Sequence, residues 1–358
     1  MKIAITHDYL ITKGGGERLV LTLAKYFKVP IYTTTYLPDE TYPEFRKMKI
    51  FLNPVKILKS PFLQTEAVFK FRNLDLSDYD LIISSGNWAK HIGVKEENHP
   101  QIHYEHTPVR AFYDLYEVVK NRLSFASRQI FKLWVWYMRK LDQEATKKID
   151  KIVTNSQNTR KRIKRFYNRD AGVIYPPVNI KKFKYKPNGD YFLSVQRIEP
   201  EKRVEIQLEI FRRLPNEKLL IVGKPGKNSI PYFERMKKIA PKNVEFLGSV
   251  SDKKLIELYA NSKAVIQTAI DEDFGLIPVE SMASGKPCLA VNEGGFRESI
   301  VHGKTGLLVN KPYVENCVKL IKNFNKYNFD PKTCRKRAEM FSEENFVKQF
   351  KSLIKLFV

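Results

Sequence analysis

The sequence predicts an α/β protein of two doubly wound domains, each a parallel sheet with helices on both faces. Short β-branched segments alternate with longer amphipathic ones in both halves of the 358 residues, a pattern typical of parallel sheets with helical crossovers. The alternation pauses at 173–178, where two consecutive prolines break regular structure. A chain of this length can give each of two domains its own core.

In the first half, several apolar segments bounded by turn-forming residues are expected to be buried strands. They are residues 2–5, 31–34, 81–84, 101–103 and 151–155. A glycine loop and a helix-like segment at 17–24 follow the first of these strands. Ser156 is placed to cap the basic helix after the last one.

The second half repeats the alternation, with expected strands at 191–195, 219–223, 244–248, 264–267 and 287–291. Between them, the segment 251–260 is a predicted helix with Ser251 as its N-cap. We therefore expect domains at 1–174 and 175–341, with a C-terminal helix at about 342–358 packing back onto the first. Ligands bind beyond the carboxyl ends of such strands, so the active site is expected in the cleft between the domains.

The charge is strongly positive. The chain has 63 Lys and Arg against 39 Asp and Glu, a formal net charge of +24, which favours anionic partners or serves solubility. Nucleic acid, an anionic membrane surface and phosphate-bearing substrates are the candidates. No recognisable nucleic-acid module is present, so nucleic acid is not expected.

The cysteines and apolar runs bear on the compartment. Cys288, Cys317 and Cys334 are odd in number and lack CxxC spacing, which argues against a disulfide scaffold or zinc site and for a reducing, intracellular compartment. The sequence opens directly on a predicted strand, so no signal peptide is expected. The run 131–138 contains Lys132 and is far shorter than a membrane span.

The most informative segment for chemistry is 271–285. A strand ends near Thr268, an acidic loop follows, and a helix is expected to begin at 276–278. The backbone amides at that helix start, with Gly275 permitting close approach, suit a phosphate. Two carboxylates flank the loop, Glu272 and Glu280, and carboxylates suit sugar and ribose hydroxyls better than phosphate.

Glu272, seven intervening residues and Glu280, with Phe-Gly-Leu between them, resemble the E-x7-E signature of family 4 glycosyltransferases. The resemblance implies a GT-B fold, two Rossmann-like domains facing across a cleft. It also implies that Glu272 binds hydroxyls of the transferred sugar and Glu280 the nucleotide ribose. The amides of Phe274, Gly275 and Leu276 would meet the donor phosphates.

A second segment, 194–202, resembles the family's donor loop. Arg197 and Lys202 have the spacing of the two cations that neutralise the donor diphosphate, although Gln196 and Arg203 stand where glycines are common. A departing nucleoside diphosphate gains negative charge, so cations there stabilise the transition state more than the ground state.

Further matches in order and spacing extend the resemblance over roughly residues 150–310. They are 155–156, 175–178, 243–248, 294–295, 298 and 303–308. In this family, Phe246, Leu247 and Gly248 would lie near the nucleotide base.

In the first half, Gly15 and Gly16 belong to a glycine run that fails the GxGxxG pattern of dinucleotide enzymes. The run resembles the family's glycine-rich loop, whose amides approach the donor phosphates or the acceptor. It also fits a tight strand–helix turn.

The segment 104–110 resembles the His-Thr-Pro-x-Arg motif of mannosyltransferase-like members. The resemblance implies that His106 bonds the transferred sugar, and a neutral imidazole can donate and accept a hydrogen bond. Tyr104 and Arg110 are the expected acceptor-binding residues, Arg110 through an acceptor phosphate. His7 and Asp8 are weaker candidates.

No metal and no cofactor is expected. Residues 271–273 read as DxD, but that motif belongs to another glycosyltransferase fold, and Arg197 and Lys202 are available for the diphosphate. Residues 303–305 mimic the end of a P-loop, yet Glu298 occupies the place of its first glycine. The nucleotide-sugar donor, GDP-mannose or a UDP-sugar, would be a substrate.

The sequence thus favours a retaining hexosyltransferase, mannose being the first candidate, that acts on a glycan or lipid-linked acceptor. A nucleotide-sugar epimerase and a basic membrane- or nucleic-acid-binding protein are the alternatives. Cytoplasmic residence is expected, with peripheral attachment to the inner face of the cell membrane as a further hypothesis. The basic aromatic stretch 122–140 either lies on anionic lipid or packs its aromatics onto the first sheet.

Overall fold

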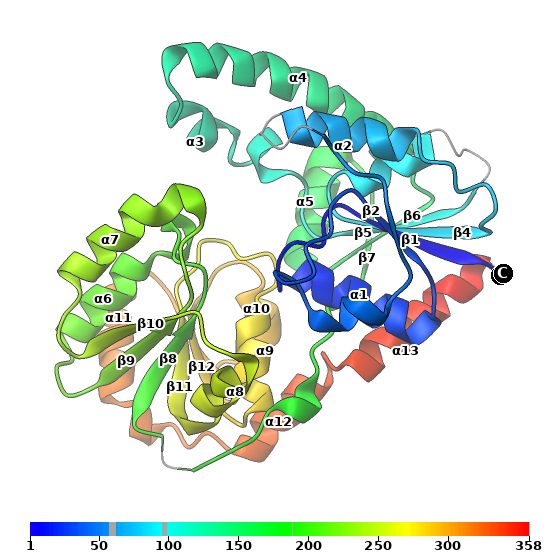
Figure 1. Cartoon of the computed structure of the whole chain (residues 1–358). Helices are drawn as coiled ribbons and strands as arrows, with labels where there is room; N and C mark the ends of the chain where they lie inside the picture. Colours follow the sequence, from blue (N-terminus) through cyan, green and yellow to red (C-terminus); the bar gives the residue numbers. More distant parts are fainter. Residues whose placement is uncertain (57–61, 95–98, 188, 358) are drawn as a thin grey trace. The chain divides into compact units, whose positions relative to one another are not determined.

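The computed structural model describes residues 1–56, 62–94, 99–187 and 189–357 (Figure 1). The chain forms two compact units, of which the first comprises Met1–Pro177 and Phe346–Val358 and the second Val178–Asn345. These divisions fall within a few residues of the predicted boundaries. The predicted C-terminal helix begins at Glu343, and its expected last residue, Val358, lies outside the described residues.

Seven strands among the described residues of the first unit form one sheet, and every pairing is parallel. The spatial order is β3-β2-β1-β4-β5-β6-β7. The strands are β1 Ile3–His7, β2 Ile31–Thr33, β3 Ile50–Leu52, β4 Leu81–Ser85, β5 Gln101–Glu105, β6 Lys151–Thr154 and β7 Gly172–Val173. All five strands expected from the sequence form. The short strands β3 and β7 are not among those expected from the sequence.

The crossover helices of the first unit are α1 Gly15–Phe27, α2 Phe62–Arg72, α3 Tyr116–Asn121, α4 Phe125–Lys148 and α5 Gln157–Tyr167. Ser156 caps α5 as predicted, because its hydroxyl accepts a hydrogen bond from the Thr159 amide at 2.9 Å. The last helix, α13 Glu343–Ile354, begins in the second unit, and its residues from Phe346 onward pack in the first.

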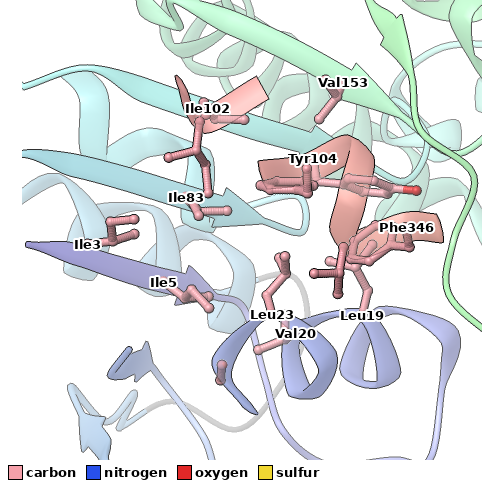
Figure 2. Packing of buried hydrophobic residues seen from close by; sticks show 14 of the residues in the cluster. Ile3, Ile5, Leu19, Val20, Leu23, Ile83, Ile102, Tyr104, Val153 and Phe346 are labelled. Carbon is pink, nitrogen blue, oxygen red and sulfur yellow. The ribbon is translucent and has the colours of Figure 1, made fainter. Parts of the chain in front are cut away.

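The core of the first unit joins its beginning to its end. Leu19, Val20 and Leu23 of α1 pack on the apolar side chains of β1 and β4, which is the face that their spacing along the helix predicts. Figure 2 shows Phe346 of α13 beside Tyr104 of β5 in the same cluster, and their ring centroids are 6.3 Å apart. The end of the chain therefore completes the core of the first unit.

The second unit repeats the architecture. Six parallel strands of its described residues follow the order β10-β9-β8-β11-β12-β13. They are β8 Tyr191–Val195, β9 Lys218–Val222, β10 Val244–Gly248, β11 Ser262–Gln267, β12 Cys288–Val291 and β13 Gly306–Val309. The five predicted strands form, and the two sheets confirm the predicted fold class of two doubly wound α/β domains.

The helices of the second unit are α6 Val204–Arg212, α7 Ile230–Ile239, α8 Asp252–Asn261, α9 Leu276–Ala283, α10 Phe296–Ser299, α11 Tyr313–Lys322 and α12 Pro331–Glu339. The predicted cap of α8 is present, since the hydroxyl of Ser251 accepts a hydrogen bond from the Lys254 amide at 3.3 Å. The three cysteines are free and buried. Of the helices described, none combines the length and the apolar character needed to cross a bilayer.

We expect Phe346→Ala to destabilise the first unit by about 3–5 kcal/mol, because its phenyl ring is 1% exposed and its loss leaves a cavity in the core. Hydrogen exchange should show lost protection in β4 and β5 and unchanged protection in β8 and β9. Leu356→Ala is the control, since this side chain is 74% exposed. Equal effects of the two substitutions would contradict a core role for the chain end.

Candidate functional site

The sheet of the first unit reverses its direction of growth between β1 and β4, which pair side by side with His7 opposite Ser85. In such sheets, ligands bind at the carboxyl ends of the strands where the order reverses, because the crossovers leave in opposite directions and open a crevice there. His7 and Ser85 are the last residues of their strands. Ser85 is not among the residues predicted from the sequence, although its place at a strand end was a usable signal.

His106 lies at this edge directly after β5. Its ring Nε2 is 2.9 Å from the hydroxyl of Ser85. A Cβ on Gly16 would lie 3.4 Å from the same Nε2 and 3.5 Å from the ring of His7, so the start of α1 closely approaches both imidazoles. The Nδ1 of His7 donates to the carbonyl oxygen of Ser85 at 3.0 Å, since a carbonyl only accepts. His106, His7, Ser85 and Gly16 therefore form one cluster.

The imidazole of His106 is held neutral. Burial lowers its pKa to about 3, and the charge of the neighbouring His7 acts in the same direction. A neutral ring retains one donor and one acceptor nitrogen. Such a ring can hydrogen-bond a ligand hydroxyl in either role.

Asp8, a weaker candidate, has a structural role instead. Its carboxylate accepts hydrogen bonds from the amides of Asn87, Trp88 and Ala89 at 2.7–2.8 Å. A Cβ on Gly86 would lie 2.5 Å from this carboxyl group, so the turn after β4 folds tightly around it. The side chain is buried, which raises its pKa.

The expected acceptor-binding role of Tyr104 is wrong. Its side chain points into the core beside Phe346, fully buried, and its hydroxyl donates to the carbonyl oxygen of Ile174 at 2.7 Å. Its position inside β5 accounts for this, because all five residues of this strand are buried, whereas His106 follows the end of the strand. Arg110 is partly exposed and forms an ion pair with Asp114 at 2.9 Å, so it remains a candidate.

A buried ionic network lies on the other side of β5 from Tyr104. The Nζ of Lys90 is 2.6 Å from Asp142 and 3.2 Å from Glu105, and all three side chains are at most 1% exposed. Burial would raise the pKa of Glu105, but Lys90 and His103 outweigh it and hold the pKa at about 2. The network fixes the residue that precedes His106.

In the second unit, the corresponding reversal lies between β8 and β11. The loops after these two strands are joined to each other. The hydroxyl of Thr268 donates to the carbonyl oxygen of Lys202 at 2.8 Å. The amide of Ile270 donates to the carbonyl oxygen of Glu201, also at 2.8 Å. At this junction the Nζ of Lys202 lies 2.5 Å from a carboxylate oxygen of Glu272, with both side chains partly exposed. Two predicted site residues thus meet.

Arg203 holds the junction together, a role that its place in the sequence does not predict. It has φ +52°, a left-handed conformation that disfavours side chains other than glycine. Its guanidinium donates to the carbonyl oxygens of Thr268 at 2.6 Å and Ala269 at 3.2 Å and pairs with Glu293 at 2.9 Å. We infer that these bonds offset the backbone strain.

Two glycines let a further loop pass close to Glu272. A Cβ on Gly294 would lie 2.4 Å from the carbonyl oxygen of Glu272, and one on Gly295 would lie 2.4 Å from the Cα of Phe274. The amide of Gly295 donates to the Glu272 carbonyl oxygen at 2.8 Å. Gly275, at φ +83°, then turns the chain into α9, whose first residue is Leu276.

The other predicted donor-site residues occupy different environments. Arg197 is 72% exposed and lies 3.2 Å from Glu199. Phe274 is buried against Phe341. Glu280, on α9, is 4% exposed and accepts a hydrogen bond from the hydroxyl of Tyr259 at 2.8 Å.

At the end of β10, Phe246, Leu247 and Gly248 are half-buried. The carbonyl oxygen of Gly248 accepts a hydrogen bond from the Gly223 amide at 2.9 Å. Phe246 packs edge-on against Phe233. These residues lie at the same carboxyl edge of the sheet as Gln196, which follows β8.

The residues described include no cluster of three or more His, Cys, Asp or Glu side chains arranged to hold a metal ion. The residues around Lys202 and Glu272 combine a lysine, the start of α9, and carboxylates that can accept hydrogen bonds from hydroxyl groups. Such a set suits an anionic organic ligand.

Both halves of the chain match families of known proteins. Residues 13–182 match the family described as Glycosyltransferase Family 4, and residues 177–341 match the one described as Glycosyl transferases group 1. The two matches together leave only the ends of the chain uncovered.

Similar curated proteins include the Mus musculus alpha-1,3/1,6-mannosyltransferase ALG2, 30% identical over 47% of this chain and 48% of the relative. The chain thus matches about half the length of that relative. The Rhizomucor pusillus protein of the same name is 24% identical over 83% of this chain and 78% of its own. The crystal structure of Anabaena HepE with UDP-glucose superposes with a TM-score of 0.77 at 19% identity, covering 99% and 100% of the two chains. This structural likeness shows the fold.

The neutral His106 should make the folded state sensitive to mild acid. Between pH 7 and 5 the unfolded chain binds a proton at this imidazole and the folded chain does not, because its pKa of about 3 lies below that range. Stability therefore falls as the pH falls. The free energy of unfolding of the wild type should fall between pH 7 and 5 by about 1 to 2 kcal/mol more than that of His106→Gln. Urea unfolding at both pH values measures this difference.

The buried His91, whose pKa is also lowered, is present in both proteins, so its contribution cancels. The same loss of stability in variant and wild type would mean that His106 is protonated in the folded protein.

Proposed function

Because this chain belongs to the family 4 glycosyltransferases of the GT-B fold, we propose that it transfers a hexose from a nucleotide-diphosphate sugar with retention of configuration. Mannose is the first candidate for the sugar, in line with the mannosyltransferases among its relatives. The acceptor is a glycan or a lipid-linked molecule. Cytoplasmic residence, with peripheral attachment at an anionic membrane surface, belongs to the same proposal.

The observation that carries the proposal is the contact of Lys202 with Glu272 at 2.5 Å, at the point where the second sheet reverses. A diphosphate needs a cation, and the sugar next to it needs hydrogen-bond acceptors for its hydroxyl groups. One short contact brings both kinds of group within reach of one small molecule. Arg197 is exposed in the same loop and supplies a second cation.

Each donor-site residue has a proposed part. Lys202 and Arg197 neutralise the charge that grows on the departing diphosphate, so they stabilise the transition state more than the bound substrate. The amides from Gly275 onward meet a phosphate at the start of α9. Glu272 accepts hydrogen bonds from sugar hydroxyls, and Glu280 from the ribose. We assign Phe246, Leu247 and Gly248 to the nucleotide base.

In the first unit, we assign His106 to the transferred sugar and Arg110 to the acceptor. Ser85 positions the His106 ring through its hydroxyl, and Gly15 and Gly16, at the start of α1, are assigned to the donor phosphates. The neutral imidazole can hydrogen-bond a sugar hydroxyl without adding a charge that would oppose the developing oxocarbenium ion. No metal or cofactor enters the proposed reaction.

The first test is thermal stabilisation by a panel of nucleoside diphosphates and nucleotide sugars, because a ligand of the folded state raises the melting temperature according to its affinity. If none stabilises the protein, the proposed donor site fails. Donor consumed in the absence of any acceptor, with a sugar epimer as product, would favour the epimerase alternative.

We expect Glu272→Gln to lower turnover by at least about a hundredfold while nucleoside diphosphate affinity stays within a few-fold, because the carboxylate acts on the sugar. Lys202→Met should instead weaken nucleoside diphosphate binding by about tenfold or more, since it removes a charged hydrogen bond.

Glu280→Gln should likewise weaken nucleoside diphosphate binding, because Glu280 is assigned to the ribose of the nucleotide. Glu245→Gln is the matched control, an exposed carboxylate of the same unit that pairs with Lys218 at 3.3 Å. Uniform loss of nucleotide binding in the Glu272, Lys202 and Glu245 variants would refute the division of roles.

A further inference from the structure

Helix α4 carries apolar side chains on two opposite faces. One face packs in the first unit, in a cluster that includes Phe131, Trp134, Val135, Met138 and Leu141. The other face is exposed at Ile130 by 59%, Leu133 by 71% and Trp136 by 56%. Ile130, Leu133 and Tyr137 are three and four residues apart along the helix, so their side chains follow one another on the same face and form a continuous stripe. The two interpretations of the stretch 122–140 thus apply to different faces of one helix.

The exposed stripe begins at the first residue of the helix. Phe125 is 78% exposed, and Tyr137 is 40% exposed. Figure 1 shows α3 and the first turns of α4 as outer elements of the first unit, away from its sheet. We call Phe125, Ile130, Leu133, Trp136 and Tyr137 the outer stripe.

Basic side chains border the outer stripe. The lining of a cavity of about 650 Å³ beside it includes five basic side chains and one acidic side chain, Glu144, which pairs with Arg72. The basic residues are Lys132, Arg139, Lys140, Lys147 and Lys148, and Tyr116 and Trp136 also line the cavity. The Nζ of Lys140 lies 3.7 Å from the centre of the Trp136 ring. Along α4, six Lys and Arg stand against two Asp and Glu, and one of those acids, Asp142, is buried against Lys90. The outer surface is therefore cationic as well as apolar.

We propose that the outer stripe and its basic border dock on an anionic lipid bilayer, with α4 lying in the plane of the membrane surface. Leu, Ile and Phe side chains enter the acyl boundary, Trp and Tyr lie at the headgroup level, and Lys and Arg meet anionic headgroups. A protein partner fits less well, because lysine is depleted at protein interfaces. Nucleic acid offers no counterpart for exposed aliphatic side chains.

This docking surface rests on the proposed function, because it names the residues that would attach the chain to an anionic membrane and so bring the first unit to a lipid-linked acceptor. Membrane binding itself needs neither donor nor acceptor. A vesicle assay without nucleotide sugar therefore separates a failure of this inference from a failure of the proposed activity.

The experiment is flotation of the full chain with vesicles of phosphatidylcholine alone or of equal parts phosphatidylcholine and phosphatidylglycerol. We expect flotation with the anionic vesicles and its loss at high salt. The triple variant Lys132→Gln/Lys140→Gln/Lys147→Gln should lower the partition coefficient about a hundredfold, which is what about 1 kcal/mol for each of three basic residues amounts to. Leu133→Ser/Trp136→Ser should also abolish flotation.

Matched controls lie in the second unit. Lys238→Gln/Lys253→Gln/Lys254→Gln removes the same charge from other exposed positions, and Ile230→Ser removes an apolar side chain that is 51% exposed. Both controls should float like the wild type. Equal flotation with neutral vesicles, equal losses in variants and controls, or no flotation at all would each overturn the proposal.

A separate observation concerns Gln196, the residue after β8. Its side chain is 9% exposed, and neither its Oε1 nor its Nε2 has a hydrogen-bond partner among the described residues. A buried amide without hydrogen-bond partners lowers the stability of the folded state. Such a group in a native protein therefore calls for an explanation, and a bound ligand that supplies the partners is one. The residue lies at the reversal of the second sheet and next to Arg197 in the chain.

We infer that the Gln196 amide is a ligand contact that hydrogen-bonds the nucleoside part of the donor. The inference rests on the proposed function, because it names a contact within the same site. An amide can donate and accept at once, as the edge of a nucleobase or the hydroxyls of ribose require.

The test is Gln196→Met, which keeps the length of the side chain and removes its polar atoms. We expect a higher melting temperature without ligand and an affinity for GDP or UDP at least tenfold weaker. Gln207→Met is the control, because the Gln207 amide donates to Thr268 at 2.9 Å and its loss should lower the melting temperature.

An unchanged nucleotide affinity or a lower melting temperature of Gln196→Met would overturn the inference. If the wild type binds neither nucleotide, the proposed function itself has failed.

Discussion

Parallel pairing of strands is the constraint on which the rest of this molecule depends. A chain that pairs its strands in parallel must return over the sheet after each strand, so every strand ends at the same edge. Where the order reverses, between β1 and β4 and again between β8 and β11, the crossovers leave in opposite directions. His7 and Ser85 end strands at the first reversal, and Gln196 and Thr268 directly follow strands at the second. The chemistry of the chain collects at these points.

Two kinds of contact hold the loops that follow the strands where the strand order reverses. In one, backbone segments pass close to each other, and in the other, oppositely charged side chains pair. Gly294 and Gly295 allow one loop to lie against Glu272, where any side chain would collide. Arg203 accepts an unfavourable backbone conformation and ties three segments together through its guanidinium. In the first unit, Lys90 between Glu105 and Asp142 performs a comparable task inside the protein. Such networks are stable only when every buried charge has a partner, and removing one partner is costly.

Part of the positive charge of the chain gathers at two places with different surroundings. Part of it lies in the Lys202 loop, where it meets Glu272, and part borders the exposed apolar stripe of α4. The first arrangement suits a small anion with hydroxyl groups. The second combines charge with apolar area, which suits a lipid surface more than a soluble ligand. A net charge of +24 by itself could not separate these uses.

The sequence by itself determined the fold class, the ten expected strands and the caps at Ser156 and Ser251, because these depend on local periodicity and on side chains near in sequence. Its motifs also selected Lys202 and Glu272, which lie together in the structure. Tertiary structure decided the rest. Tyr104 lies in the core and His106 at the edge because of the direction of β5 and the return of Phe346. The hydroxyl of Ser85 contacts His106, and Arg203 binds Thr268, Ala269 and Glu293. These contacts join segments distant in sequence, and no local pattern contains them.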